Sequence, residues 1–183
     1  MIRPWKRVGS RPVGDYQIFS LRADRVVSPR TGQEHEFYAI ECVDWVNVIA
    51  VTSDDHLVLV QQYRHGSNTI ELEIPGGMMD AHDASPVEAG VRELREETGY
   101  VGDSARVIGR VYPNPALQTN TCHTILVQNC SARHERKLDH GEDLATRLVP
   151  CADLPRLVAE GQFGHSLVIV ALYYYDLLRR GLR

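Results

Sequence analysis

The stretch Gly76–Tyr100, GGMMDAHDASPVEAGVRELREETGY, decides the fold of the region around it. Its second half has the spacing of a helix with one buried face. The residues of that face are Val87, Val91, Leu94 and Thr98. Pro86 suits the first helical turn, and Gly99 suits the position that ends a helix. The sequence therefore predicts a helix that begins near Pro86, stops at Gly99 and packs against a sheet.

Three carboxylates crowd another face of the same helix. Glu93, Glu96 and Glu97 fall on one side because a helix advances roughly 100° per residue. Like charges at this spacing repel one another and weaken a helix unless a positive group lies among them. Oxygen ligands without histidine or cysteine suit Mg²⁺, with Mn²⁺ as the alternative. We therefore interpret these glutamates as metal ligands; the competing interpretation is an exposed, salt-bridged surface helix.

The segment RELREETGY resembles the second half of the Nudix box, G-x5-E-x7-R-E-U-x-E-E-x-G-U, in which U is a bulky apolar residue. The box glycine corresponds to Gly77. The core corresponds to Arg92, Glu93, Leu94, Glu96, Glu97 and Gly99. The first half departs from the pattern, because the upstream acid is Asp83 rather than glutamate and eight residues instead of seven separate it from Arg92. The resemblance therefore covers the helical ligands and leaves the role of Asp83 open.

The resemblance implies an α/β (α+β) fold, a Nudix α/β/α sandwich around a mixed sheet. It also implies metal-assisted attack of water on a pyrophosphate. The backbone carbonyl before the box glycine, here that of Gly76, is an implied metal ligand beside the three glutamates. Arg92 is implied to hold a box carboxylate in place, and Arg92 and Glu96 are counted among the catalytic residues.

Outside the box, the chain is similar to nucleoside diphosphate sugar hydrolases related to ADP-ribose pyrophosphatases. The supporting segments are DWVNVIAV at 44–51, LVQQYRHG at 59–66, ELEIPGG at 71–77 and DHGED at 139–143. The branch implies hydrolysis of an ADP-ribose-like or GDP-mannose-like compound to a nucleoside monophosphate and a sugar phosphate. The alternatives are a Nudix enzyme acting on nucleoside triphosphates or RNA 5′ ends, and a non-catalytic nucleotide-sugar sensor.

The general base of this branch comes from a glutamate on a late loop, to which Glu142 corresponds; Asp143 and His140 are alternatives. Candidate substrate contacts are Arg64, Trp45, Glu73, Asn114, Gln118 and Asn120. A guanidinium such as that of Arg64 binds phosphate in a forked contact. Each candidate has a purely structural alternative, such as a core aromatic or an exposed strand end. Ala116 and Leu117 depart from the ADP-ribose pyrophosphatase pattern, which favours a broader or different nucleotide-sugar preference.

Strand-like runs and turns divide the chain into two parts. Residues 15–43 hold two such runs joined by the turn residues Pro29 and Gly32, and a hairpin of this kind is marginal alone. In the branch that the chain resembles, N-terminal strands form a small sheet that takes part in a dimer. We therefore expect an N-terminal β subdomain at 1–43, a Nudix domain at 44–183 and a homodimer, with a monomer as the alternative. Further strands are expected at 45–52, 57–63, 105–112, 124–128 and 146–149, and helices at 153–161 and 165–180.

Composition agrees with a compact enzyme of 183 residues, 43% hydrophobic and 24% charged. The net charge of −4 weighs against nucleic acid as a partner. No apolar run has transmembrane length, and the N-terminus MIRPWKRVGS lacks the apolar stretch of a signal peptide. The cysteines are scattered, at Cys42, Cys122, Cys130 and Cys151. We therefore expect a cytoplasmic protein with reduced cysteines and no membrane partner.

Overall fold

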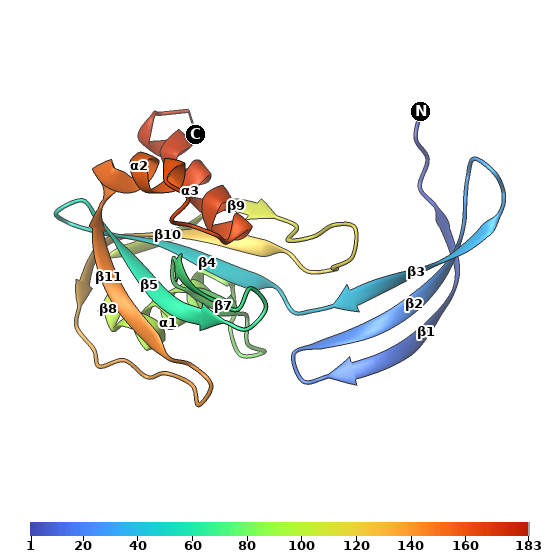
Figure 1. The fold of residues 1–183 in the computed structure, drawn as a ribbon, viewed down its shortest axis with the longest axis horizontal. Helices are drawn as coiled ribbons and strands as arrows, with labels where there is room; N and C mark the ends of the chain where they lie inside the picture. The colour runs from blue at the N-terminus through green and yellow to red at the C-terminus, as the bar shows by residue number, and fades with distance from the viewer. Residues whose placement is uncertain (183) are drawn as a thin grey trace. The chain divides into compact units, whose positions relative to one another are not determined.

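The computed structural model describes residues 1–182, which form two compact units. One unit comprises Met1–Asp44 and Tyr112–Thr121, and the other comprises residues 45–111 and 122–182. Each unit has its own sheet, coloured blue in the first and cyan to orange in the second (Figure 1).

The first unit is built on a three-stranded antiparallel sheet in the described residues, with the order β1-β2-β3. Its strands are β1 (Lys6–Tyr16), β2 (Phe19–Val27) and β3 (Glu34–Glu41). The sequence predicted a two-stranded hairpin here and did not predict β1, because Gly9, Pro12 and Gly14 are unfavourable inside a strand. The structure tolerates them on an edge strand, where the register shifts between Arg7 and Gly9 and between Pro12 and Gly14.

The segment Tyr112–Thr121 belongs with this first sheet. The backbone N–H of Ile40 donates to the Leu117 carbonyl at 2.8 Å, and the Ile40 carbonyl accepts from Thr119 N–H at 3.1 Å. The Asp44 carboxylate accepts from the backbone N–H of Thr121 at 2.8 Å and from its hydroxyl at 2.7 Å. The predicted division at residue 43 does not include this segment in the first part.

The second sheet has the order β11-β5-β4-β10-β8 in the described residues, with β6 beside β5, β7 beside β4 and β9 beside β10. The strands β4 (Trp45–Thr52) and β10 (Cys122–Ala132) run parallel, and the other pairs are antiparallel. The remaining strands are β5 (His56–Arg64), β6 (Thr69–Glu73), β7 (Gly76–Met78), β8 (Tyr100–Val101), β9 (Ser104–Val111) and β11 (Leu144–Pro150). The predicted mixed sheet is confirmed.

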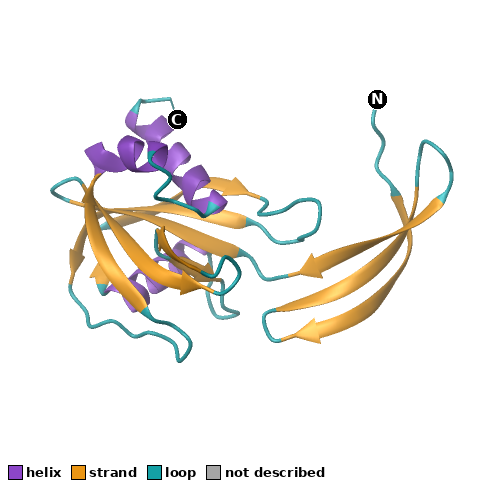
Figure 2. Ribbon diagram, viewed as in Figure 1, coloured by secondary structure: helices purple, strands orange, loops and turns teal. Residues whose placement is uncertain are grey.

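Helices lie on both faces of this sheet (Figure 2). The helix α1 (Pro86–Thr98) lies on one face, and α2 (Leu154–Ala159) and α3 (Ser166–Arg179) lie on the other. Successive side chains of β4 point to opposite faces. Val48 therefore packs in the core beneath α1 with Leu94, whereas Ile49 packs in the core beneath α3 with Val168. The predicted α/β/α sandwich is confirmed.

Candidate active site

Local sequence signals fix both ends of α1. The Ser85 hydroxyl accepts from the backbone N–H of Glu88 at 3.2 Å, and the Glu88 carboxylate accepts from Ala84 N–H at 2.9 Å. The first contact is the hydroxyl half of a capping box, whereas the glutamate reaches Ala84, the residue before the N-cap, instead of Ser85 itself. Pro86 occupies the first turn, and Gly99 ends the helix with a φ of 76°. The predicted helix ends are confirmed, and the Ser-x-x-Glu cap was a further signal that the sequence interpretation did not use.

Two glycines of strand β7 permit close contacts, Gly77 with a box carboxylate and Gly76 with strand β4. A Cβ on Gly77 would lie 2.5 Å from Oε1 of Glu93, and one on Gly76 would lie 2.2 Å from the carbonyl oxygen of Val46. The backbone N–H of Gly76 donates to Oε2 of Glu97 at 3.1 Å. The structure therefore brings together Gly76, Glu93 and Glu97, three of the predicted metal ligands.

Burial makes the charges of Glu93 and Glu97 unfavourable. These residues are only 9% and 3% exposed. Loss of hydration raises the pKa of Glu93 to about 7, against the opposing effect of Arg92. Loss of hydration, followed by the charge of Glu93, raises the pKa of Glu97 to about 9. The pair therefore needs a positive partner in order to be fully ionised near neutral pH.

The donor set around this pair fits a hard divalent cation. It consists of carboxylate and backbone oxygens, the ligands that Mg²⁺ and Mn²⁺ prefer. Glu96 is more exposed, and its carboxylate lies 3.1 Å from Arg92. Within residues 1–182, no three His, Cys, Asp or Glu side chains are arranged so that together they could hold a metal ion. Buried negative charge thus favours a cation here, while the full ligand set stays a prediction.

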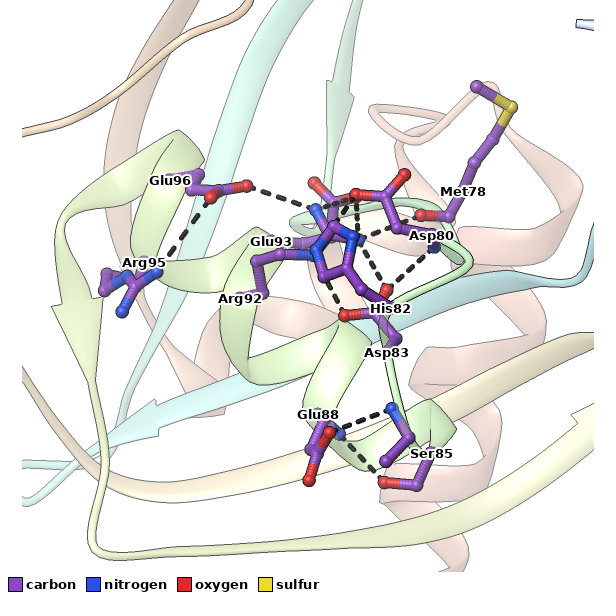
Figure 3. A network of polar contacts seen from close by, with 11 residues as sticks. Met78, Asp80, His82, Asp83, Ser85, Glu88, Arg92, Glu93, Arg95 and Glu96 are labelled. Atoms are coloured by element: carbon purple, nitrogen blue, oxygen red, sulfur yellow. Dashed lines mark hydrogen bonds and ion pairs between the residues drawn. The ribbon is translucent and has the colours of Figure 1, made fainter.

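Arg92 joins the box helix to the loop that precedes it (Figure 3). Its Nη1 donates to Oε1 of Glu93 at 3.0 Å and to Oε2 of Glu96 at 3.1 Å. Its Nε and Nη2 donate to the two carboxylate oxygens of Asp83 at 3.1 and 2.9 Å. This guanidinium holds the pKa of the Asp83 carboxyl below its ordinary value. Arg92 therefore contacts the box carboxylates, as expected. Its other partner is Asp83, the upstream acid whose role the sequence left open.

Glu142 lies on the loop between β10 and β11. Its backbone N–H donates to the Asp139 carbonyl at 3.0 Å, and its carboxylate accepts from Asp139 N–H at 2.9 Å. The negative charge of Glu142 contributes to the raised pKa of both buried box glutamates. In the same loop, Lys137 N–H donates to the Glu96 carbonyl at 2.8 Å, which attaches this segment to α1. The loop carboxylate is therefore electrostatically coupled to the box.

Arg64 and Glu73, predicted separately as substrate contacts, pair with each other. Arg64 Nε and Nη2 donate to the Glu73 carboxylate oxygens at 2.7 and 2.8 Å, between the neighbouring strands β5 and β6. Glu73 is only 2% exposed, and His165 Nδ1 lies 3.8 Å from its Oε2. The forked face of Arg64 is therefore engaged within the protein. The sequence interpretation missed this pairing because it depends on the alignment of two strands.

The remaining predicted substrate contacts divide between the two units. Trp45 is half-buried at the start of β4, with β7 on one side and β10 on the other. Asn114, Gln118 and Asn120 belong to the first unit. Asn120 is 2% exposed, and its side-chain amide has no hydrogen-bond partner in the described part of the chain. The structure therefore groups Trp45, but not the three amides, with the box unit.

Replacing Glu97 by glutamine should stabilise the metal-free protein at alkaline pH. The folded-state pKa of about 9 lies above the ordinary 4.5, so the folded protein keeps a proton that the unfolded chain has released. The free energy of unfolding therefore falls as pH rises through this window. In EDTA, we expect the free energy of unfolding of E97Q to exceed that of wild type by on the order of 2 kcal/mol at about pH 8. The two values should be equal near about pH 5.

Urea unfolding across a pH series measures this difference. The matched control is E96Q, because Glu96 belongs to the same helix but is more exposed. Parallel pH profiles for wild type and E97Q would contradict the argument from buried charge.

Comparisons with known proteins agree with this geometry. The NUDIX domain family matches residues 43–169. An ADP-ribose pyrophosphatase of Bacillus subtilis (strain 168) is 29% identical over 178 residues, covering 94% of this chain and 95% of that protein. An ADP-sugar pyrophosphatase of Mus musculus is 33% identical over 144 residues, covering 73% of this chain and 66% of that protein.

A solved structure described as a crystal structure of ADP compounds hydrolase has a similar fold. It superposes with a TM-score of 0.85 at 20% identity, covering 100% of this chain and 99% of that chain. The chain therefore belongs to the Nudix family, in its ADP-ribose pyrophosphatase-like branch, and is a pyrophosphohydrolase, as the box residues predicted.

Proposed function

We propose that this chain hydrolyses the pyrophosphate bond of a nucleoside diphosphate sugar in a metal-dependent reaction. The products are a nucleoside monophosphate and a sugar phosphate. The observation that carries the proposal is the buried pair Glu93 and Glu97 beside Gly76, whose unbalanced negative charge suits a divalent cation. The relatives named ADP-ribose pyrophosphatase and ADP-sugar pyrophosphatase support an ADP-ribose-like substrate, with a GDP-mannose-like one as the alternative.

In this proposal, Mg²⁺ or Mn²⁺ is held by the Gly76 carbonyl and by Glu93, Glu96 and Glu97. Such a cation, when bound, polarises phosphoryl oxygens and lowers the pKa of a water ligand. Arg92 keeps Glu93 and Glu96 oriented through the two hydrogen bonds from its Nη1. The metal carboxylates are therefore preorganised by the chain itself.

Glu142 is the proposed general base. It accepts a proton from the water whose oxygen bonds to phosphorus, while the bond from phosphorus to the bridging oxygen breaks. Two observations support this role: the negative charge of Glu142 raises the pKa of both buried box glutamates, and the backbone hydrogen bond from Lys137 to Glu96 attaches its loop to the box helix. The turn that Glu142 forms with Asp139 holds the carboxylate in place before substrate arrives.

Arg64 is the proposed phosphate ligand. Glu73 already accepts from Nε and Nη2, so Nη1 is the atom that we assign to a phosphate oxygen. Glu73, which was predicted to contact the substrate, is then proposed to act indirectly, by orienting the guanidinium of Arg64. Proposed contacts to the base and sugar are Trp45, Asn114, Gln118 and Asn120. The unsatisfied amide of Asn120 supports its inclusion, because buried amides normally have a partner.

Two other functions would use the same fold. A Nudix enzyme for RNA 5′ ends needs a basic surface for the phosphate chain, whereas this chain has a net charge of −4. A sensor of nucleotide sugars needs no metal carboxylates, whereas this chain keeps Glu93, Glu96 and Glu97. Both observations favour hydrolysis of a nucleotide sugar.

Turnover on a substrate panel tests the proposed function. With excess Mg²⁺ or Mn²⁺, we expect rapid release of phosphatase-sensitive products from one or more of ADP-ribose, GDP-mannose and UDP-glucose. Glu97→Gln should lower this rate roughly 100-fold, because it removes a metal ligand. A dinucleotide and a nucleoside triphosphate complete the panel, the latter followed by pyrophosphate release. Turnover of the triphosphate alone would assign the protein to the triphosphatases, and binding without turnover would favour the sensor.

Glu142→Gln should lower kcat roughly 10²- to 10⁴-fold, which is the usual contribution of a general base. KM should stay within about twofold of wild type, and the Mn²⁺ Kd should change far less than kcat, because the substitution keeps the shape of the side chain and removes proton acceptance together with one negative charge near the box. Steady-state kinetics and Mn²⁺ titration measure these quantities. The matched controls are D143N and H140Q on the same loop. A loss of kcat in either control, with E142Q unaffected, would move the base to that residue.

We also propose that the chain forms a homodimer through its N-terminal sheet. Trp5 and Phe37 are 45% and 53% exposed in this unit. The rings of Trp5 and Phe37 pack edge to face with centroids 5.7 Å apart. Clustered exposed aromatics of this kind are typical of protein–protein contacts, and a second copy of the same chain is the commonest partner of such a surface.

Light scattering after size exclusion should give twice the 20.6 kDa mass of the chain. Phe37→Glu should shift this mass to that of a monomer, because it places a charge in the apolar cluster. The matched control is V107E, which alters a similarly exposed apolar residue of the second unit. A wild-type mass of 20.6 kDa would refute the dimer.

A reducing compartment such as the cytoplasm is the proposed location. All four cysteines are free thiols in the structure, as expected where thiols are kept reduced. Separately, no helix within residues 1–182 is long and apolar enough to span a bilayer.

A further inference from the structure

The first part of the loop between β10 and β11 is attached to the end of the box helix. The backbone N–H groups of Arg133 and His134 both donate to the Gly99 carbonyl, at 3.0 and 3.1 Å. Further along, the N–H of Lys137 donates to the Glu96 carbonyl at 2.8 Å. Carbonyls in the last turn of a helix have no partner within the helix, and this loop supplies partners for them. The position of the loop is therefore tied to α1, the helix of the proposed metal ligands.

Gly99 permits this close approach. Its φ is 76°, and a Cβ there would lie 2.2 Å from the carbonyl oxygen of His134. Any other residue would therefore displace the loop from the helix, in addition to straining the left-handed backbone. The glycine that ends α1 thus also sets where the loop begins.

The side chain of Arg136 joins the beginning of the loop to its end. Its Nη1 donates to the carbonyl oxygen of Leu144 at 2.6 Å. Leu144 is the first residue of β11, is only 5% exposed and pairs with Gln62 of β5. Hydrogen bonds from a guanidinium are short and strong because the donor is charged. Residues 137–143 therefore form a loop that one side chain closes against the sheet.

Glu142 lies within this closed loop. The N–H of Asp139 donates to its Oε2 at 2.9 Å, so Oε1 is the oxygen that this turn leaves to accept a proton. After the larger effect of burial, the charge of Glu142 contributes to the raised pKa of both Glu93 and Glu97. The closed loop thus keeps a carboxylate within electrostatic range of the buried box glutamates.

We propose that Arg136 is a positioning residue for the general base, because it closes the loop on Leu144 and so holds Glu142 beside the box. A general base acts only within hydrogen-bond reach of the water that it deprotonates. Among the hydrogen bonds of the described residues, only the one from Lys137 N–H would then fasten this part of the loop if Arg136 were removed. This inference rests on the proposed function, because it assumes that Glu142 accepts the proton.

Steady-state kinetics on the nucleotide sugar that turns over fastest are the first test. We expect R136Q to lower kcat roughly 10- to 100-fold, because small displacements in an active site have effects of this size. KM and the Mn²⁺ Kd should stay within about twofold of wild type, since Arg136 bonds a backbone carbonyl of β11 and not a metal or phosphate ligand. The matched control is R133Q, which removes the same charge from the same loop. The Arg133 side chain bonds Ser131 and Asp103, so this control should keep wild-type kcat.

A double substitution shows whether Arg136 acts through Glu142. In an E142Q background, R136Q should change kcat less than about twofold, because the carboxylate that it positions is already gone. The same fold-loss in both backgrounds would overturn the proposal, because Arg136 would then act independently of the base. An equal loss in R136Q and R133Q would overturn it as well, since the effect would come from charge and not from closure of the loop.

Hydrogen exchange measures the loop itself, without any turnover. The amides of residues 137–143 should exchange several-fold faster in R136Q than in wild type, because opening the loop no longer breaks the hydrogen bond to Leu144. In R133Q, these amides should exchange as in wild type. Equal exchange in R136Q and wild type would show that Arg136 does not close the loop.

Wild type and E142Q separate this proposal from the proposed function. If wild type turns over none of the substrate panel, or if E142Q keeps full kcat, the proposed reaction or its base is wrong and the positioning role falls with it. If wild type is active, E142Q loses kcat and R136Q does not, only the positioning role fails.

Discussion

The burial of Glu93 and Glu97 is the constraint on which the rest of the site depends. Removing a carboxylate from water is unfavourable by several kcal/mol unless hydrogen bonds or opposite charges replace its hydration. The Gly76 N–H supplies one such bond to Glu97, and the missing side chain of Gly77 lets Glu93 lie against the backbone. A side chain at Gly77 would displace Glu93, and one at Gly76 would displace strand β4. Gly77 therefore makes room for Glu93, and Gly76 lets β7 lie close to β4 while its N–H reaches Glu97.

The same constraint extends into the sheet. For its glutamates to reach β7, α1 must lie very close to the central strands. Gly90 permits this approach, because a Cβ there would come within 2.8 Å of the Ile125 side chain on β10. Leu94, fully buried on the helix face toward the sheet, then holds α1 against the core. Packing on one side of the helix and charge on the other are thus set by a single helical register.

Local patterns predicted the elements around the site well. The strands β4 and β5 occupy Trp45–Thr52 and His56–Arg64, where 45–52 and 57–63 were expected, and α3 occupies Ser166–Arg179, where 165–180 was expected. Alternation and helical periodicity are properties of neighbouring residues, so a sequence displays them directly. The link between Asp44 and Thr121 joins residues 77 positions apart and has no local signature. The edge strand β1 was missed because its glycines and proline resemble a loop.

The site residues divide in the same way. The box carboxylates and Arg92 follow from spacing along one helix, whereas the partners of the two arginines follow from tertiary structure. Glu73 reaches Arg64 through the alignment of β5 and β6, and Asp83 reaches Arg92 through a turn in a loop of unusual length. No periodicity in the sequence encodes either contact.

Those two contacts decide the charge balance of the site. Arg64 lowers the pKa of Glu97, and Arg92 lowers that of Glu93, yet burial still raises both values above the ordinary one. Burial outweighs the effect of both arginines. Each arginine also pairs with another carboxylate, Glu73 for Arg64 and Asp83 for Arg92. Arg92 still donates to Glu93 through Nη1, but its charge is shared with Asp83 and Glu96. The chain thus places arginines beside its buried carboxylates without fully replacing the hydration that those carboxylates lose, and this arrangement favours a bound cation.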